Sequence, residues 1–438
     1  MLSQWKENQQ QKSLEDSHRS IAIPQNASFW KKLLAYSGPG YLVAVGYMDP
    51  GNWATSLAAG SQFGYALLSV VFLSNLMAIL LQYLAIKLGI VTSKDLAQAC
   101  RAYYSAPIAF LLWVLAEIAI IACDLAEVIG SAIALNLLFN IPLTYGVIIT
   151  AIDVFLILFL QHRSFRYLEI LVIVLIATIF TCFIIDIILA QPVIADLLYG
   201  FIPTPELITN STMLFLTVGI LGATVMPHNL YLHSSIVQSR RYPETVAGKK
   251  EAVFFSFIDS TLALSIAFFV NAGILIVSAA VFHAHGYYEV AEIQDAYHLL
   301  CLILHSKAAS IIFALALLAA GQNATVTGTL AGQIIMEGFI NIQISPWLRR
   351  LLSRSLAIIP ASLCVIYFGQ HGLARLLLFS QVILSFQLPF AVWPLIQFTN
   401  SKEKMGSFAN SWYLKLAAYF VALIITGLNL WLIYLSMF

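Results

Sequence analysis

The sequence Met48-Asp49-Pro50-Gly51-Asn52 interrupts an apolar run that is long enough to cross a membrane, and Val225-Met226-Pro227-His228-Asn229 interrupts a second one. Proline lacks the backbone N–H that a helix needs, and it disfavours helical geometry in the residue before it. Each helix is therefore expected to break at its X-Pro-X-Asn segment. Such breaks persist at membrane depth only where they line a cavity or are buried in protein. Paired breaks in corresponding positions of two halves point to the binding site of a transporter.

The composition is that of an all-α integral membrane protein. Of the 438 residues, 60% are hydrophobic and 10% are charged, whereas a soluble protein carries roughly 25% charged residues. The net charge of +1 indicates no particular partner. Beyond the lipid bilayer we expect no nucleic acid and no obligate protein partner. The cysteines are dispersed without a CxxC pair, which predicts packing roles rather than disulfides or a zinc site; they are Cys100, Cys123, Cys182, Cys301 and Cys364.

The apolar runs predict eleven transmembrane helices, since each span needs about 20 apolar residues. They lie at 38–62, 66–89, 107–138, 143–160, 167–190, 211–238, 251–282, 308–339, 351–368, 374–398 and 412–436. With the N-terminus inside, all Lys and Arg residues except Lys307 and Arg375 fall on the cytosolic side, which is 20 of 22. Positive charge accumulates on that side of a membrane. We therefore expect a multi-pass protein of the plasma (inner) membrane with a cytosolic N-terminus and an external C-terminus.

The spans divide into two halves of five. Residues 1–30 are polar and lack the apolar core of a signal peptide, so we expect them to be disordered, and residues 1–37 together form the expected cytosolic N-terminal tail. Residues 38–190 and 211–398 form the proposed repeats, and 412–436 is an extra span. An odd number of spans inverts the second repeat in the membrane, and the broken spans 1 and 6 then occupy corresponding places. The two breaks are expected to meet near the bilayer midplane.

The residues at the breaks predict a mixed metal site. Asp49 offers a carboxylate, Asn52 an amide oxygen, Met226 a thioether and Ala223 a backbone carbonyl freed by unwinding. An intramembrane carboxylate indicates function, although Asp49 can also cap the second half of its helix. A thioether favours softer transition metals, and Mg²⁺ sheds its waters reluctantly. This ligand set therefore favours Mn²⁺ or Fe²⁺, with Cd²⁺ and Co²⁺ as further candidates, over Ca²⁺ and Mg²⁺.

At these residues the chain resembles the bacterial members of the Nramp family (natural resistance-associated macrophage proteins). The resemblance runs through spans 1 to 11 and rests on several motifs: Asp49-Pro50-Gly51-Asn52, Met226-Pro227-His228-Asn229 continuing to Ser234, Gly321-Gln322-Asn323 continuing to Phe339, and Gln387-Leu388-Pro389-Phe390-Ala391. It implies a LeuT-type fold and secondary active import of divalent metal ions, driven by protons through alternating access. It also implies metal ligation by Asp49, Asn52, Met226 and the Ala223 carbonyl, joined by Gln381 in some states.

Carboxylates in span 3 suggest a path for protons. Asp124 and Glu127 are three residues apart and share one helix face. Two adjacent carboxylates in a low dielectric do not both ionise easily. Arg354, the deepest of three arginines that begin span 9, is the expected partner. This set is either a proton route or a structural ion pair, and the resemblance favours the proton route.

Other polar residues in the spans have two open interpretations. Histidine titrates near neutral pH, and His233 is either a proton relay or a gating residue, whereas we favour a structural role for His228. The two histidines are about 140° apart on a helix, so they cannot chelate one metal together. Gln82 in span 2 and Asn271 in span 7 either pack helices together or gate the path.

Three competing functions are disfavoured by the residues. A Na⁺-coupled amino-acid transporter of the same fold presents helix N-termini to its substrate and has no use for Asp49 opposite Met226. Relatives that carry Mg²⁺ lack the span 6 methionine. An enzyme would need a nucleophile–base pair or a zinc set such as HExxH, and neither is present, so we expect no catalysis and no cofactor. Histidines and acids in the loop 283–305 suggest metal capture, but their spacing follows no ligand template and favours a solvated loop.

Overall fold

The computed structural model describes residues 18–24, 26–150, 165–290, 292–340, 346–368 and 372–437. Over these ranges the chain is almost entirely helical. The α-helices are α2 Phe29–Tyr36, α3 Pro39–Gly46, α4 Pro50–Phe63, α5 Leu68–Thr92, α6 Leu96–Tyr103, α7 Ala106–Phe139, α9 Phe165–Ala190, α10 Ile194–Tyr199, α11 Glu206–Thr209, α12 Ser211–Val225, α13 Pro227–Ile236, α14 Val246–Val281, α15 Ile293–Ile303, α16 Lys307–Ile340, α17 Pro346–Phe368, α18 Leu373–Asn400, α19 Lys402–Met405 and α20 Trp412–Met437. The short elements are β1 Ile21–Ala22, β2 Arg240–Arg241, η2 Val237–Ser239, η3 His283–His285 and η4 Gly406–Phe408.

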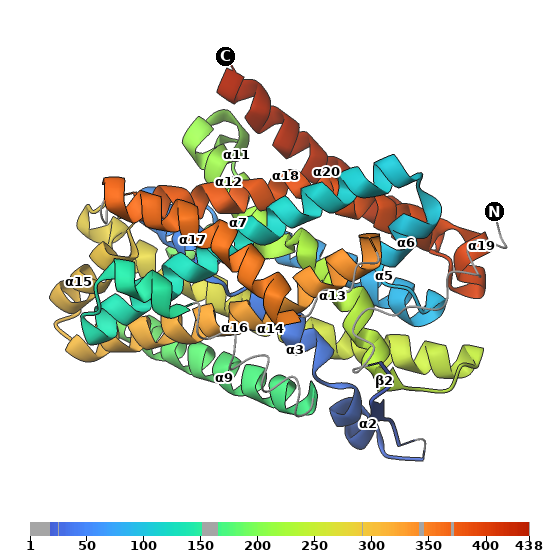
Figure 1. The fold of residues 1–438 in the computed structure, drawn as a ribbon. Coiled ribbons are helices and arrows are strands. Elements are labelled where there is room, and N and C mark those ends of the chain that lie inside the picture. The colour runs from blue at the N-terminus through green and yellow to red at the C-terminus, as the bar shows by residue number, and fades with distance from the viewer. Residues whose placement is uncertain are drawn as a thin grey trace.

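Long helices surround the two broken ones. The helix α14 packs against α3, α4 and α5, while α16 packs against α7 and α9, and α18 packs against α7 and α12. Figure 1 shows α15 at one end of this bundle and α6 and α19 at the other. The elements α2, β2, α6 and α19, whose sequences carry Lys or Arg residues, lie toward the second end, so we call it the charged end and the first the α15 end.

Eight stretches of the described chain are helical, long and apolar enough to cross a membrane: α5, α7, α9, α12 with α13, α14, α16, α18 and α20. They match eight of the predicted spans. The first predicted span is divided between α3 and α4, and α17 occupies the ninth. Most of the span predicted at 143–160 lies outside the described residues. The all-α membrane fold is confirmed, and the total of eleven spans stays a prediction.

Both proline-containing helices break where the sequence predicts. The helix α3 ends at Gly46 and α4 begins at Pro50, while α12 ends at Val225 and α13 begins at Pro227. In each case the proline takes the first position of the new helix, where its missing N–H costs nothing. At the end of α3 the N–H groups of residues 47, 48 and 49 bond three residues back, which tightens the last turn before the chain unwinds.

The N-terminal segment differs from the prediction. Residues 1–17 and residue 25 lie outside the described part, but the expected disorder is wrong for residues 18–24 and 26–30, which include β1 and the first residues of α2. The strand β1 pairs in parallel with β2. The helix α2 stacks Tyr36 on Phe255 of α14 with ring centroids 5.3 Å apart, and Lys32 bonds Glu251 at 2.7 Å. These contacts give an otherwise polar segment an apolar face to bury.

A buried ion cluster fastens the start of α3 at the charged end. Glu169 of α9 accepts from Arg240 at 2.6 Å and from Arg166 at 2.8 Å. Both arginines also donate to the carbonyl of Ser37, directly before α3. The next residue, Gly38, has φ 139°, and a Cβ there would overlap the Glu169 carboxylate. The sequence analysis counted these arginines only as positive charge on the cytosolic side. In the structure they position the first half of span 1.

Glu169→Ala should destabilise the protein strongly. It leaves Arg240, whose side chain is 1% exposed, buried without its counter-ion, and breaking a buried pair in this way costs about 3–5 kcal/mol. Thermal unfolding in detergent should show a clear fall in Tm. The control Glu251→Ala removes a partly exposed pair with Lys32, which costs about 0–1 kcal/mol. Equal effects of the two substitutions would contradict the structural role of the Glu169 cluster.

Candidate metal centre

Asn52 joins the two broken helices. Its backbone N–H and its side-chain amide both donate to Asp49 Oδ1, at 2.8 and 2.9 Å. The same amide nitrogen donates to the carbonyl of Ala223 at 2.8 Å. In an unbroken helix that carbonyl would accept from the N–H of residue 227, but Pro227 has none. The side chain of Asn52 therefore replaces the hydrogen bond that the proline removes.

The second break makes the reciprocal contact with the first broken helix. Asn229 donates its side-chain amide to the carbonyl of Val43 in α3 at 3.3 Å, and to Met226 Sδ at 3.6 Å. A Cβ at Gly46 would overlap the Asn229 amide, so this approach requires glycine. Each X-Pro-X-Asn segment thus donates from its asparagine to a backbone carbonyl in the other broken helix. These reciprocal bonds hold the two breaks face to face.

Asp49 has one oxygen in use and one without a partner. Its Oδ1 caps α4, which is the structural role considered for it, whereas Oδ2 has no hydrogen-bond partner among the described residues. Asp49 is fully buried, and Asn52 and Met226 are at most 1% exposed. A buried carboxylate oxygen without a partner is costly. The group therefore has an unsatisfied capacity to bind a proton or a cation.

Met226 lies at the break itself with an unusual backbone. Its φ of 36° lies in a region that side chains other than glycine rarely adopt, and such strain clusters at functional sites. The side chain packs among Ala119 and Cys123 of α7 and Leu384 of α18. The structure therefore holds the thioether where α7, α13 and α18 converge.

Gln381 of α18 lies directly beside the first break. A Cβ at Gly51 would overlap its side-chain amide, and a Cβ at Gly222 would overlap its backbone carbonyl. Its nitrogen donates to Ser380 Oγ at 2.9 Å, while Oε1 has no partner among the described residues. Gln381 therefore adds an amide oxygen to the groups that converge on the break.

Asn271 and Gln82 contact the break from two other helices. Asn271 donates to the carbonyl of Tyr47 at 2.6 Å and to Asn52 Oδ1 at 3.2 Å. Gln82 donates to the Tyr47 hydroxyl at 2.7 Å and bonds His233 Nδ1 at 2.9 Å through its Oε1. The Tyr47 hydroxyl in turn donates to the carbonyl of Val225 at 3.4 Å. Tyr47 thus ties α5 and the end of α12 to the first break on the side of the charged end.

The two histidines of α13 lie in different surroundings. His233 faces Gln82, whereas His228 Nε2 lies 3.8 Å from Cys123 Sγ of α7. Cys123 also donates to Glu127 Oε1 at 3.5 Å. It is therefore His228, for which we favoured a structural role, that lies beside the acidic face of α7.

The acidic face of α7 extends to the break. Asp124 lies within electrostatic range of His228, and Glu127 within electrostatic range of Asp49. Both carboxylates of α7 are fully buried. The helix α17, which carries Arg354, packs against α7, but the side chain of Arg354 lies outside what the structure describes.

Three contact residues were missed from the sequence: Tyr47, Cys123 and Asn229. Asn229 had a usable signal, because it is the counterpart of Asn52 in the second X-Pro-X-Asn segment. Cys123 lies one turn before Glu127 on the same face of α7, but a cysteine in an apolar run is usually a packing residue. Tyr47 carried no signal beyond its place before the break.

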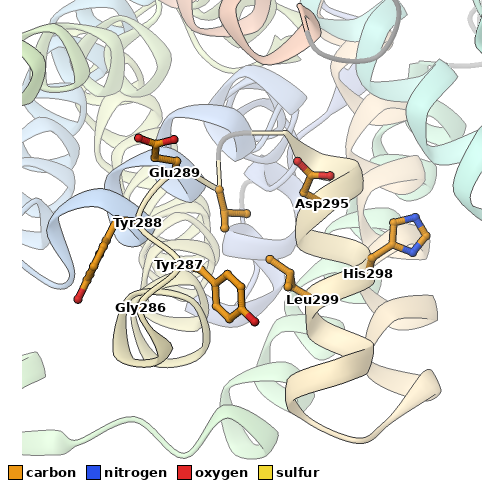
Figure 2. A pocket seen from close by; sticks show the side chains of 8 residues that line it. Gly286, Tyr287, Tyr288, Glu289, Asp295, His298 and Leu299 are labelled. Carbon is orange, nitrogen blue, oxygen red and sulfur yellow. The ribbon is translucent and has the colours of Figure 1, made fainter.

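The described residues of the loop at the α15 end do not bring three metal-binding His, Cys, Asp or Glu side chains together. The loop lines a cavity of about 600 Å³ with Tyr287, Glu289, Asp295 and His298. Figure 2 shows Glu289 on the loop and Asp295 on α15, with His298 pointing away from the loop. Within the described ranges, no three His, Cys, Asp or Glu side chains come together in a metal-binding group. This agrees with a candidate centre that relies on amide, thioether and carbonyl groups around a single carboxylate.

Comparisons with known proteins match this arrangement. The family model described as natural resistance-associated macrophage protein-like matches residues 40–435. A curated protein of Listeria innocua, named divalent metal cation transporter MntH, is 58% identical over 433 residues, which cover 99% of this chain and 97% of that protein. A crystal structure of the manganese transporter of Eremococcus coleocola has a TM-score of 0.89 and 44% identity, covering 96% of this chain and 90% of that one.

A more distant solved structure shares the fold alone. Mhp1, a nucleobase-cation-symport-1 family transporter in a closed conformation, has a TM-score of 0.60 at 14% identity, covering 91% of each chain. The helix arrangement therefore extends beyond close relatives, and the expected LeuT-type architecture is confirmed.

Proposed function

Because the chain belongs to the natural resistance-associated macrophage protein-like (Nramp) family of membrane transporters, we propose that it imports divalent transition-metal ions, Mn²⁺ and Fe²⁺ above all. The observation that carries this proposal is Asp49 Oδ2, which has no hydrogen-bond partner in the described part of the chain and lies at a buried break that also holds Met226. The names of the Listeria and Eremococcus relatives, a divalent metal cation transporter and a manganese transporter, support the same substrate class.

The ligand types support selection for transition metals. Asp49 supplies a hard oxygen, and Asn52, Gln381 and the carbonyl of Ala223 add neutral oxygens. Met226 supplies the only soft donor of the proposed set, and thioethers favour softer ions such as Mn²⁺, Fe²⁺, Co²⁺ and Cd²⁺ over Ca²⁺ and Mg²⁺. A Mg²⁺ substrate or a Na⁺-coupled amino-acid substrate would leave this donor unused.

We propose that protons move along α7. Asp49 lies within electrostatic range of Glu127, and Asp124 within electrostatic range of His228. Cys123 bridges Glu127 to His228. A buried chain of titratable groups inside a membrane protein suits a proton relay. Arg354 of α17 remains the proposed partner of these carboxylates. His233, bonded to Gln82, is better suited to gating than to this relay.

Contacts at both ends of span 1 support alternating access. Toward the charged end, Tyr47 bonds Gln82, and Ser37 is held by the Glu169 cluster. Toward the α15 end, Ser278 bonds the carbonyl of Leu57 at 2.7 Å, and Ser61 bonds the carbonyl of Val290 at 2.9 Å. We propose that each set closes one side of the metal centre, so that release of one set at a time would expose the site to one side.

The proposal also covers the location, the orientation and the repeats of the protein. We place the protein in the plasma membrane, with the charged end and the N-terminus in the cytosol and the C-terminus outside. The ranges 38–190 and 211–398 are the proposed inverted repeats, and 412–436 is the extra span. The proposal includes no catalysis, cofactor or obligate protein partner.

Asp49→Asn should abolish metal uptake. It keeps the oxygen that caps α4 but removes the negative charge, and loss of a ligand's charge should lower uptake by roughly 100-fold or more. The measurement is Mn²⁺ uptake into proteoliposomes under an imposed pH gradient. The burial-matched control Asp186→Asn, in α9, should transport normally. Normal uptake by the Asp49 variant would refute the proposed site.

Met226→Ala should weaken discrimination rather than abolish transport. The hard ligands remain, so some Mn²⁺ uptake should persist, while Ca²⁺ or Mg²⁺ should begin to compete because the soft donor is gone. Competition of added divalent ions against Mn²⁺ uptake measures this change. Met213→Ala, a buried methionine earlier in the same broken helix, is the matched control. If Ca²⁺ remains excluded in the Met226 variant, the thioether is not the selectivity filter.

Asp124→Asn should impair proton coupling more than metal binding. A pH-sensitive dye inside the vesicles should report less acidification per Mn²⁺ ion taken up, and uptake should depend less on external pH. Mn²⁺ binding in detergent should change little, because Asp124 is not a proposed ligand. Asp196→Asn, an exposed substitution in α10, serves as the control. An unchanged pH dependence in the Asp124 variant would exclude this residue from the relay.

A further inference from the structure

A second cavity lies on the flank of the bundle near the charged end, where α5, α14, η4 and α20 meet (Figure 1). Its volume is about 710 Å³. It does not involve the metal centre or the α7 carboxylates. Its wall is mainly apolar, with two lysines and two serines; the lining residues are Leu76, Ile79, Leu80, Tyr83, Lys87, Lys250, Val253, Phe254, Phe257, Ser407, Phe408, Ala409, Ser411 and Leu414. We call it the α5–α14 groove.

The polar part of the groove carries positive charge without a matching carboxylate. Lys87 is 4% exposed, donates to Asn410 Oδ1 at 2.6 Å and lies 5.4 Å from the ring centroid of Tyr83. Within the described residues neither Lys87 nor Lys250 forms a salt bridge. A buried ammonium group with a single neutral partner calls for an anion.

The nearby acids are already paired. Glu244 bonds Arg19 and Lys249, and Glu251 bonds Lys32. These carboxylates therefore do not serve as counter-ions for the groove. The two lysines of the groove leave a positive site that an external anion can fill.

The apolar part of the groove matches the depth of one membrane leaflet. From Leu76 to Lys87 the helix α5 rises about 16 Å, and half of the bilayer's hydrocarbon core is about 15 Å. Leu80, Phe254 and Phe257 line the same stretch. The groove thus has a cationic end at Lys87 and Lys250 and an apolar wall about as long as an acyl chain.

We propose that the α5–α14 groove binds an anionic phospholipid from the leaflet at the charged end. Its phosphate would lie between Lys87 and Lys250, with the hydroxyl groups of Ser407 and Ser411 as further donors, and one acyl chain would follow the apolar wall. Lysines near an anionic membrane surface attract such lipids. The bound lipid would connect α5, which carries Gln82, to α14 and α20.

The test compares lipids on the full-length protein in detergent. Phosphatidylglycerol should raise Tm as its mole fraction increases, because a ligand that binds only the folded state stabilises it. Phosphatidylcholine with the same acyl chains and inorganic phosphate should each give a much smaller shift. Native mass spectrometry should detect bound phosphatidylglycerol. Equal shifts with the two lipids would overturn the proposal, and so would an equal shift with inorganic phosphate.

Variants separate the groove from general surface charge. Lys87→Gln with Lys250→Gln should weaken phosphatidylglycerol binding roughly 30-fold, since each lysine near the surface contributes about a fivefold factor. The control, Lys31→Gln with Lys402→Gln, removes two exposed lysines outside the groove and should keep the binding. If the double variant at the groove does not fold, Lys250→Gln alone and the groove-filling Leu80→Trp should each reduce it. Unchanged binding in the groove variants would overturn the proposal.

Discussion

The structure depends on the backbone groups that two prolines leave without helical partners. Unpaired backbone groups are costly inside a membrane protein, so each break can exist only where a side chain replaces the lost bond. Asn52 supplies such a replacement for the carbonyl of Ala223, and Asn229 reaches across to the carbonyl of Val43. Because both asparagines donate to the opposite helix, satisfying the backbone also fixes the two breaks against each other. The place of the candidate metal centre is a consequence of this pairing.

Close packing around the breaks depends on glycines, which have no side chain that would keep the neighbouring groups apart. A Cβ at Gly130 of α7 would overlap Pro50, just as one at Gly51 would overlap Gln381 and one at Gly46 would overlap Asn229. Small residues let helices in membranes approach closely. The glycines therefore bring the acidic face of α7 and the amide of α18 to the unwound segments, and the polar groups around the break come from several helices rather than from one motif.

The sequence predicts those features that are local to the chain. Proline chemistry locates both breaks, and the residue types beside them identify Asp49, Asn52 and Met226 as candidates. Features that depend on tertiary contacts could not be predicted from the sequence as well. His228 lies close to Cys123 because α13 crosses α7. The spacing of residues along the chain does not indicate this crossing. The order of the start of α2 was missed because Phe29 packs against a distant aromatic partner, Phe255 of α14.

The two oxygens of Asp49 give the proposed coupling a physical basis. Oδ1 accepts both bonds from Asn52, so the carboxylate is held in place whether or not it is charged. Oδ2 has no partner among the described residues, and it is the atom at which a proton or a metal ion can bind. If both ligands use this one oxygen, arrival of the metal requires departure of the proton. Glu127 lies within electrostatic range of the Asp49 carboxylate and is joined to His228 through Cys123. Under the proposed function, the metal ion and the proton then exchange at a single atom, Asp49 Oδ2.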